Sequence, residues 1–158
     1  MTLTRRTTSA AYTVLIALAT VAIVLQGVWA GFFLRPGASD GTGWIDIHAR
    51  GGEVALALSV LATLVAFVRV RHRRDLWIGS ASLTALLVIE AYLGGLIHDS
   101  GKESLTPVHV PLALAITGLA AWLLARSRRR DDKASAVVYP AERRSAPAEV
   151  HEDPAEVV

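Results

Sequence analysis

The sequence contains no cysteine, and this absence removes several classes of protein at once. Disulfide scaffolds, thiolate zinc sites, iron–sulfur clusters and covalently attached c-type haem all require cysteine. Charged residues make up only 19% of the chain, and no phosphate-binding loop, nucleophile elbow or HExxH motif occurs. Apolar residues are abundant instead: they make up 53% of the 158 residues and gather in long runs, which is typical of a membrane protein.

Four apolar runs are each long enough to cross a bilayer, because a spanning helix needs about 20 apolar residues. In lipid a helix satisfies its own backbone hydrogen bonds, so these runs predict helices and not strands. We therefore predict an all-α four-helix membrane bundle over residues 12–126, with spans near 12–34, 47–67, 76–97 and 108–125. Residues 1–11 would form a cytoplasmic N-terminus. Residues 127–158, rich in Ala, Pro, Glu and Arg, would form a disordered cytoplasmic tail.

Arginine clusters predict the orientation. They precede the first span, separate the second from the third and follow the fourth, whereas the other two loops carry only Arg35 and Lys102. The positive-inside rule then places both termini in the cytoplasm of a cell membrane of bacterial type. Such clusters suit a membrane surface better than nucleic acid. A cleaved signal peptide ending near Ala30 is the weaker alternative, because the first apolar run is longer than a usual signal sequence. The clusters are Arg5 and Arg6; Arg69, Arg71, Arg73 and Arg74; and Arg126, Arg128, Arg129 and Arg130.

An internal repeat links the two halves of the bundle. Residues 24–32 align with residues 88–96 at an offset of 64, which places Gln26 on Glu90. A polar loop follows each segment, and a histidine, His48 or His109, then opens the next helix. Parallel repeats are related by an approximate two-fold axis along the membrane normal. The repeat therefore predicts that the two histidines face each other near the outer surface.

Two facing imidazoles in a chain without cysteine are candidate axial ligands of one haem b. Small residues below each histidine indicate either close helix packing or room for a flat ligand. Arg50 is a candidate partner for a haem propionate, since its guanidinium matches a carboxylate. His98 is a reserve ligand, whereas His72 and His151 lie in segments expected to be solvated. The small faces comprise Gly52, Ala55 and Ser59, and Ala113, Ile116 and Ala120.

Polar residues within the spans allow two interpretations. In one, Glu53 pairs with Arg50 and Glu90 bonds to Gln26 across the bundle. In the other, the two carboxylates handle protons or face a ligand, because intramembrane carboxylates are costly and usually functional or paired. Zinc is a weaker alternative, because His48, His98, His109 and an aspartate, Asp46 or Asp99, have no short ligand spacing.

Several segments together resemble one half of a haem A synthase. They are residues 25–31 (LQGVWAG), 45–50 (IDIHAR), 93–95 (LGG) and 108–109 (VH). That family has two four-helix halves, each with a pair of histidines facing the bundle on the outer side. The pattern is also similar to small four-span bacterial membrane proteins of unassigned function. The resemblance implies that His48 and His109 are axial ligands, but this chain has half the family's length. Ile45 also stands where the family has an acidic residue, so oxidation of a haem methyl group is not implied.

The sequence thus predicts a membrane protein that binds one haem for electron transfer or haem handling, and an electron carrier or accessory protein more than a stand-alone enzyme. A quinone or a redox partner protein would be needed, because one haem near one face cannot bridge the bilayer. The alternative is a cofactor-free structural or accessory subunit. A small proton channel is disfavoured, because no charged residue interrupts the inner half of any span. The Gly27-x-x-x-Gly31 motif predicts a helix contact, either within the chain or with a second copy.

Overall fold

The computed structural model describes residues 9–35 and 41–144, with side chains placed for residues 9–35 and 43–128. In that part of the chain the fold is all-α, as predicted. Its elements are α1 (Ala10–Phe33), α2 (Gly41–Arg69), α3 (Arg74–Ser100), the short 3-10 helix η1 (Glu103–Leu105) and α4 (Thr106–Arg144).

All four long helices are long and apolar enough to cross a membrane, which confirms the fold class predicted from the apolar runs. The chain is a four-span helical membrane protein. Each helix begins earlier than the predicted span, most clearly α2, which starts at Gly41 instead of residue 47. Helix α3 ends at Gly101, whose φ of 62° lies in the left-handed region that glycine adopts most readily, and Lys102 N–H donates to Leu96 O at 3.2 Å.

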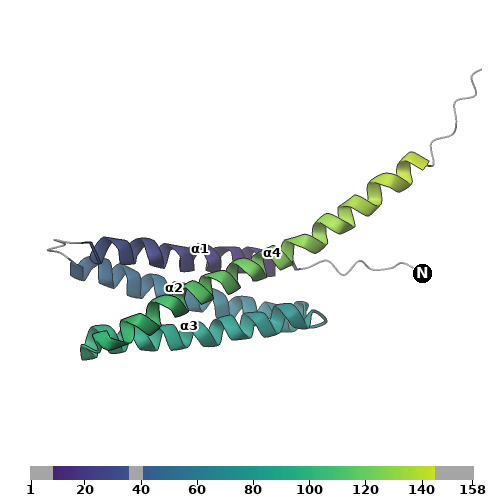
Figure 1. Ribbon diagram of the computed structural model, residues 1–158. Coiled ribbons are helices and arrows are strands. Elements are labelled where there is room, and N and C mark those ends of the chain that lie inside the picture. The colour runs from purple at the N-terminus through teal and green to yellow at the C-terminus, as the bar shows by residue number, and fades with distance from the viewer. Residues whose placement is uncertain (1–8, 36–40, 145–158) are drawn as a thin grey trace, which may run out of the picture.

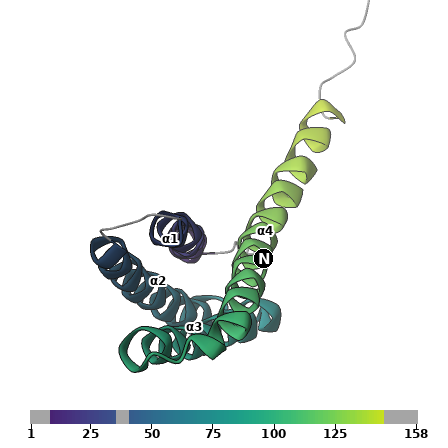
Figure 2. The ribbon, with the colours of Figure 1, turned by 60° about the vertical axis from the view of Figure 1, so that its left-hand side comes forward.

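The helices form a ring in which each contacts its neighbours in the chain and α4 closes onto α1. Among the described residues, no Cα atoms approach within 8 Å between the diagonal pairs, α1 with α3 and α2 with α4. Figures 1 and 2 show this arrangement along the bundle and from a second direction. Diagonal placement of repeat-equivalent helices is what a two-fold axis between two parallel repeats requires.

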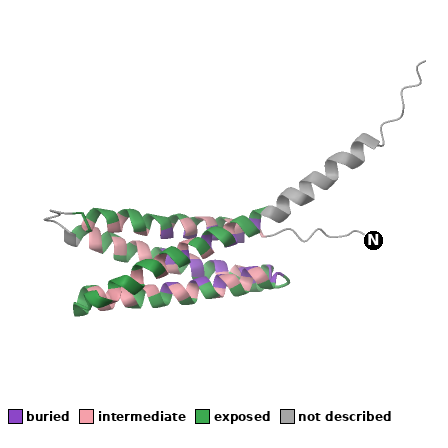
Figure 3. Cartoon of the chain, in the orientation of Figure 1, coloured by how far each residue is buried: buried purple, intermediate pink, exposed green. Residues whose placement is uncertain are grey.

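The two ends of the bundle differ in packing. We call the end that carries Gln26, His48, Glu90 and His109 the His end, and the opposite end, with Arg73 and Arg126, the Arg end. Every fully buried residue of the described chain lies in the Arg-end half or at mid-bundle. Residues 24–34, 43–54 and 88–115 contain none, and in Figure 3 the buried colour is correspondingly missing from the end of the bundle with the loops that follow α1 and α3.

Close helix contacts and hydroxyl pairs build the packed half. Ser59 Oγ lies 2.7 Å from Thr84 Oγ1, which ties α2 to α3. A Cβ added at Gly79 would lie 2.8 Å from Cδ2 of the buried Leu123, so glycine allows α3 and α4 to approach closely. Small residues at such contacts are usual in membrane bundles, where van der Waals packing holds the helices together.

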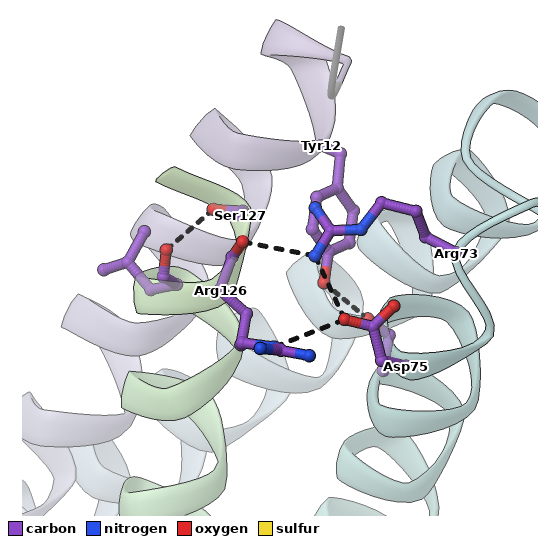
Figure 4. A network of polar contacts seen from close by, with 7 residues as sticks. Tyr12, Arg73, Asp75, Arg126 and Ser127 are labelled. Atoms are coloured by element: carbon purple, nitrogen blue, oxygen red, sulfur yellow. Dashed lines mark hydrogen bonds and ion pairs between the residues drawn. The ribbon is translucent and has the colours of Figure 1, made fainter. Parts of the chain in front are cut away.

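A polar network closes the Arg end (Figure 4). The buried Arg73 donates to Asp75 Oδ2 at 3.0 Å and to the backbone oxygen of Arg126 at 3.3 Å. Arg126 Nε in turn lies 3.4 Å from the same Asp75 oxygen. Beside this network, the Tyr12 hydroxyl lies 3.0 Å from Ser80 Oγ. The start of α1, the start of α3 and the middle of α4 are thereby joined.

Helix α4 continues past the predicted fourth span to Arg144. The tail predicted to begin at residue 127 therefore starts within this helix. Residues 145–158, with His151, and residues 1–8, with Arg5 and Arg6, lie outside the described residues. The disorder of the tail remains a prediction.

Candidate functional site

The two histidines singled out by the repeat both lie at the His end, on the diagonal helices α2 and α4. Both side chains are half-buried. The chain positions them early in their helices, after the two loops of this end. The structure therefore places both histidines at the same end of the bundle, as their matching positions in the sequence predict.

His48 is held by α1. Its Nδ1 lies 3.2 Å from the backbone oxygen of Gln26, and Phe33 packs edge-on against its ring with the centroids 5.5 Å apart. The Gln26 side chain turns away and donates from Nε2 to Ala22 O at 3.2 Å. It also lies directly against Gly51, where an added Cβ would collide with the amide nitrogen. Glycine at position 51 thus leaves room for the Gln26 amide beside His48.

His109 is held by α3. Its Nδ1 lies 3.1 Å from Glu90 Oε1, and the exposed fractions of the two side chains are 19% and 13%. The distance is that of an ion pair, but the two groups are not aligned as a hydrogen bond, and both Glu90 oxygens are buried without a hydrogen-bond partner. One helical turn further on, Gly94 faces the ring, so that an added Cβ would lie 3.5 Å from His109 Cε1.

These contacts follow the sequence repeat. His48 contacts residue 26 and His109 contacts residue 90, and those two positions are related by the same offset of 64 that aligns the two segments. The contacts differ in kind, because α1 offers a backbone carbonyl whereas α3 offers a side-chain carboxylate. The repeat thus holds in structure, with one chemical difference between its two units.

Both imidazoles have Nδ1 within 3.2 Å of a protein oxygen, and neither Nε2 has a partner among the described residues. This is the usual arrangement of metal-binding histidines, in which the second ring nitrogen is fixed by a carbonyl or carboxylate while the first is left for the metal. The small residues below the histidines do not leave room for a flat ligand. Ala55, Ser59 and Ile116 are fully buried in the packed half, so those faces are helix contacts.

The other predicted polar residues lie apart from this pair. Arg50 donates to Glu53 at 3.2 Å, which confirms that pairing, and with exposed fractions of 81% and 68% the two side chains face away from the bundle. His98 is exposed, as are Asp46, Asp99 and His72. Within the described part of the chain no group of three or more His, Asp or Glu residues is arranged to hold a metal ion, so the zinc alternative gains no support.

The predicted bond between Glu90 and Gln26 across the bundle is wrong. Helices α1 and α3 are diagonal and their Cα atoms do not come within 8 Å of each other, and each side chain has another neighbour: Ala22 O for Gln26, and His109 for Glu90. The sequence did not predict the contacts of Phe33, Gly51 and Gly94 with the site. Gly94 lies within the repeated segment, directly before Gly95, which aligns with Gly31. That position was the one sequence signal that pointed to Gly94.

A cluster of stacked aromatic rings lies beside the site at the His end. Trp44 stacks on Phe32 with centroids 4.4 Å apart and on Trp29 at 6.0 Å. Aromatic side chains are enriched at membrane interfaces, and this cluster fits that use. Near it, Gly27 and Gly31 are exposed, and an added Cβ at either would meet open space. Contact with a second copy through this pair remains a prediction.

Fold and geometry together define a four-span helical membrane protein with two histidines at one end of the bundle. No family model, curated protein or solved structure matches the chain.

Proposed function

We propose that this membrane protein binds one b-type haem at the His end, with His48 and His109 as axial ligands. One observation carries the proposal: two imidazoles on diagonal helices each have Nδ1 next to an oxygen of a repeat-equivalent residue, and neither Nε2 has a partner among the described residues. A haem held by two neutral histidines needs one such nitrogen from each side.

The surroundings of the pair fit a bound group. Glu90 and Gln26 carry buried oxygens without a hydrogen-bond partner, which is costly in a membrane protein unless something compensates it. The His end also contains no fully buried residue in the described chain, whereas buried residues are frequent toward the Arg end. An apolar, planar ligand would supply the missing packing. Arg50 is the candidate partner for a propionate; its side chain faces away from the bundle and pairs with Glu53, so it would have to turn toward the His end to reach one.

A haem with both axial positions filled supplies one-electron chemistry and disfavours oxygen activation. His48 and His109 would hold the iron, and Gln26 O and Glu90 would fix the rings. The arginine clusters favour an orientation with the Arg end in the cytoplasm and the His end outside. Electrons would then pass to or from a quinone or a redox partner protein at the outer side. The resemblance to haem A synthases supports the choice of the two histidines and nothing further.

A cofactor-free accessory subunit is the second candidate, and the exposed Arg50–Glu53 pair favours it. An ion pair that faces away from the bundle within a predicted span is costly in lipid and is better accommodated against another protein. In that case the histidines would only make polar contacts between helices.

A visible spectrum of the purified protein separates the two candidates. Protein expressed with ample haem supply should carry about one haem per chain and give a low-spin spectrum, as expected for two nitrogen ligands. His48→Ala and His109→Ala should each turn the spectrum high-spin or remove the haem. Colourless protein that is folded by circular dichroism would refute haem binding and favour the accessory subunit.

Three matched variants control for the ligand assignment. His72→Ala should leave the spectrum unchanged, because His72 is exposed near the Arg end. His98→Ala should also leave it unchanged, although His98 lies at the His end and is the reserve ligand. A spectrum that responds to His98→Ala but not to His109→Ala would keep the haem and reassign the second ligand. Asp99→Ala is a neutral reference in the same exposed turn.

A further inference from the structure

The two units of the repeat treat their histidines differently, and the difference is one of charge. At position 26 the contact with His48 is made by a backbone carbonyl, which no substitution of the side chain removes. At position 90 the contact with His109 is made by a carboxylate. The paired imidazoles are therefore equivalent in position but not in electronic environment.

Glu90 has no other partner that would explain its burial. Both of its oxygens are buried without a hydrogen bond, and the nearest described cation or donor is the His109 ring, 3.1 Å away. A carboxylate at this depth of an apolar helix is rare and marks a functional role or a pair. Gly94, one turn along α3, bounds the same ring at Cε1, so α3 contacts His109 at two points.

We propose that Glu90 is a positioning residue for His109: it orients the imidazole through Nδ1 and makes its Nε2 the more basic of the two ligand atoms. This inference rests on the proposed haem site. A carboxylate on the far nitrogen of a metal-binding histidine fixes the tautomer and raises the basicity of the ligand. A more basic ligand stabilises ferric over ferrous iron, so Glu90 would hold the reduction potential below that of a site with two carbonyl-bound histidines.

The chain offers a matched pair of variants for the test. Glu90→Gln keeps the size of the side chain and removes the charge. Asp99→Asn also removes one carboxylate charge, from an exposed position in the last turn of the same helix. In the holoprotein, Glu90→Gln should change the ferric-to-ferrous binding ratio by about tenfold, which raises the midpoint potential by about 59 mV for one electron. Asp99→Asn should leave the potential unchanged.

The haem dissociation rate gives a second readout. Loss of a partner that orients a metal ligand typically weakens metal binding by about 10–100-fold. Transfer of haem to an excess of apomyoglobin should therefore be at least about tenfold faster from Glu90→Leu than from wild type. Glu90→Asp keeps the charge, so its rate of haem transfer should lie between those of wild type and Glu90→Leu. Thermal melting of each variant establishes that it is folded.

A measurement without haem tests the orientation directly. Protein labelled with ¹⁵N-histidine and prepared without cofactor should show His109 protonated at Nδ1 at pH 8, with the signal assigned through His109→Gln. Glu90→Leu should lose that preference. An unprotonated Nδ1 in wild type, or a preference unchanged in Glu90→Leu, would overturn the inference.

The outcomes separate this inference from the proposed function. Haem bound normally with the same potential and dissociation rate in Glu90→Gln as in wild type would refute the role of Glu90 and leave the haem site standing. An equal shift in Asp99→Asn would also refute it, because the effect would then come from any loss of negative charge at this end of α3. Wild-type protein that binds no haem would overturn the proposed function and the effect on potential together.

Discussion

The hydroxyl of Tyr12 lies 3.0 Å from Oγ of Ser80, and both side chains are fully buried. This contact joins the first turns of α1 to α3, two helices whose backbones do not touch. It therefore crosses the diagonal of the ring, which no backbone contact does in the described chain. A buried hydroxyl pair in this place should be measurable as a coupling between the two residues.

We expect Tyr12→Phe and Ser80→Ala each to lower the free energy of unfolding by about 0.6–1.7 kcal/mol, the range of interhelical hydrogen bonds in membrane proteins. The double variant should be less destabilised than the sum of the two, because each single change already removes the bond. Unfolding by SDS titration in mixed micelles measures all three. Strictly additive effects would show that the hydroxyls do not interact.

Gly79 should be intolerant of a methyl group. An added Cβ would lie 2.8 Å from Cδ2 of Leu123, which is fully buried and has no room to yield. Overpacking of this kind costs about 1–3 kcal/mol, so Gly79→Ala should lower the unfolding free energy by that amount.

The matched control for this prediction is Gly118→Ala, because an added Cβ there meets open space in α4. Alanine is the better helix former, so Gly118→Ala should be neutral or slightly stabilising. Combining Gly79→Ala with Leu123→Val should recover part of the loss. Equal effects of Gly79→Ala and Gly118→Ala would contradict the close approach of α3 and α4.

The orientation of the chain is open to chemical labelling. With the Arg end in the cytoplasm, Ser104→Cys should react with an impermeant thiol reagent on intact cells, and His72→Cys should react only after lysis. Both positions are exposed, and the native chain has no cysteine to compete. If only His72→Cys were labelled on intact cells, the orientation would be the reverse of the predicted one, with the histidine pair on the cytoplasmic side.

Arg50 should contribute to haem retention if it binds a propionate. Hydrogen bonds to charged groups contribute about 1.5–3 kcal/mol, so Arg50→Ala should speed haem dissociation by about tenfold or more. Glu53→Gln should not speed it, because an exposed pair such as Arg50–Glu53 contributes little by itself. Arg74→Ala, an exposed arginine at the Arg end, is the reference. Dissociation equally fast in wild type and in Arg50→Ala would remove Arg50 from the site.

The sequence was sufficient for the fold class because the length of an apolar run is a property of one helix at a time. It also placed His48 and His109 at one end of the bundle, since the repeat relates whole helix pairs. The side-chain partners that each residue meets on the other helices were harder to predict. The depth of Glu90 along α3 follows from its position in the sequence, but its partner depends on the order of the helices around the ring. Because α1 is diagonal to α3, Gln26 was the wrong neighbour and His109, on the adjacent α4, the right one.

The early start of α2 was missed for a different reason. Residues 41–46 include two glycines and an aspartate, which favour a loop when they are considered alone. In the structure the helix includes them, and Trp44 stacks on Phe32 of α1. Here the tertiary contact overrides the local helix propensity. The propensities of the single residues therefore do not predict where α2 begins.

The uneven packing of the bundle has a consequence for biogenesis. The buried residues gather toward the Arg end, away from the proposed haem site. If haem binds at the His end as proposed, the bundle could be inserted and folded before the cofactor arrives, and could be loaded later from its less packed side. Supply of the prosthetic group and synthesis of the polypeptide would then be separable in time.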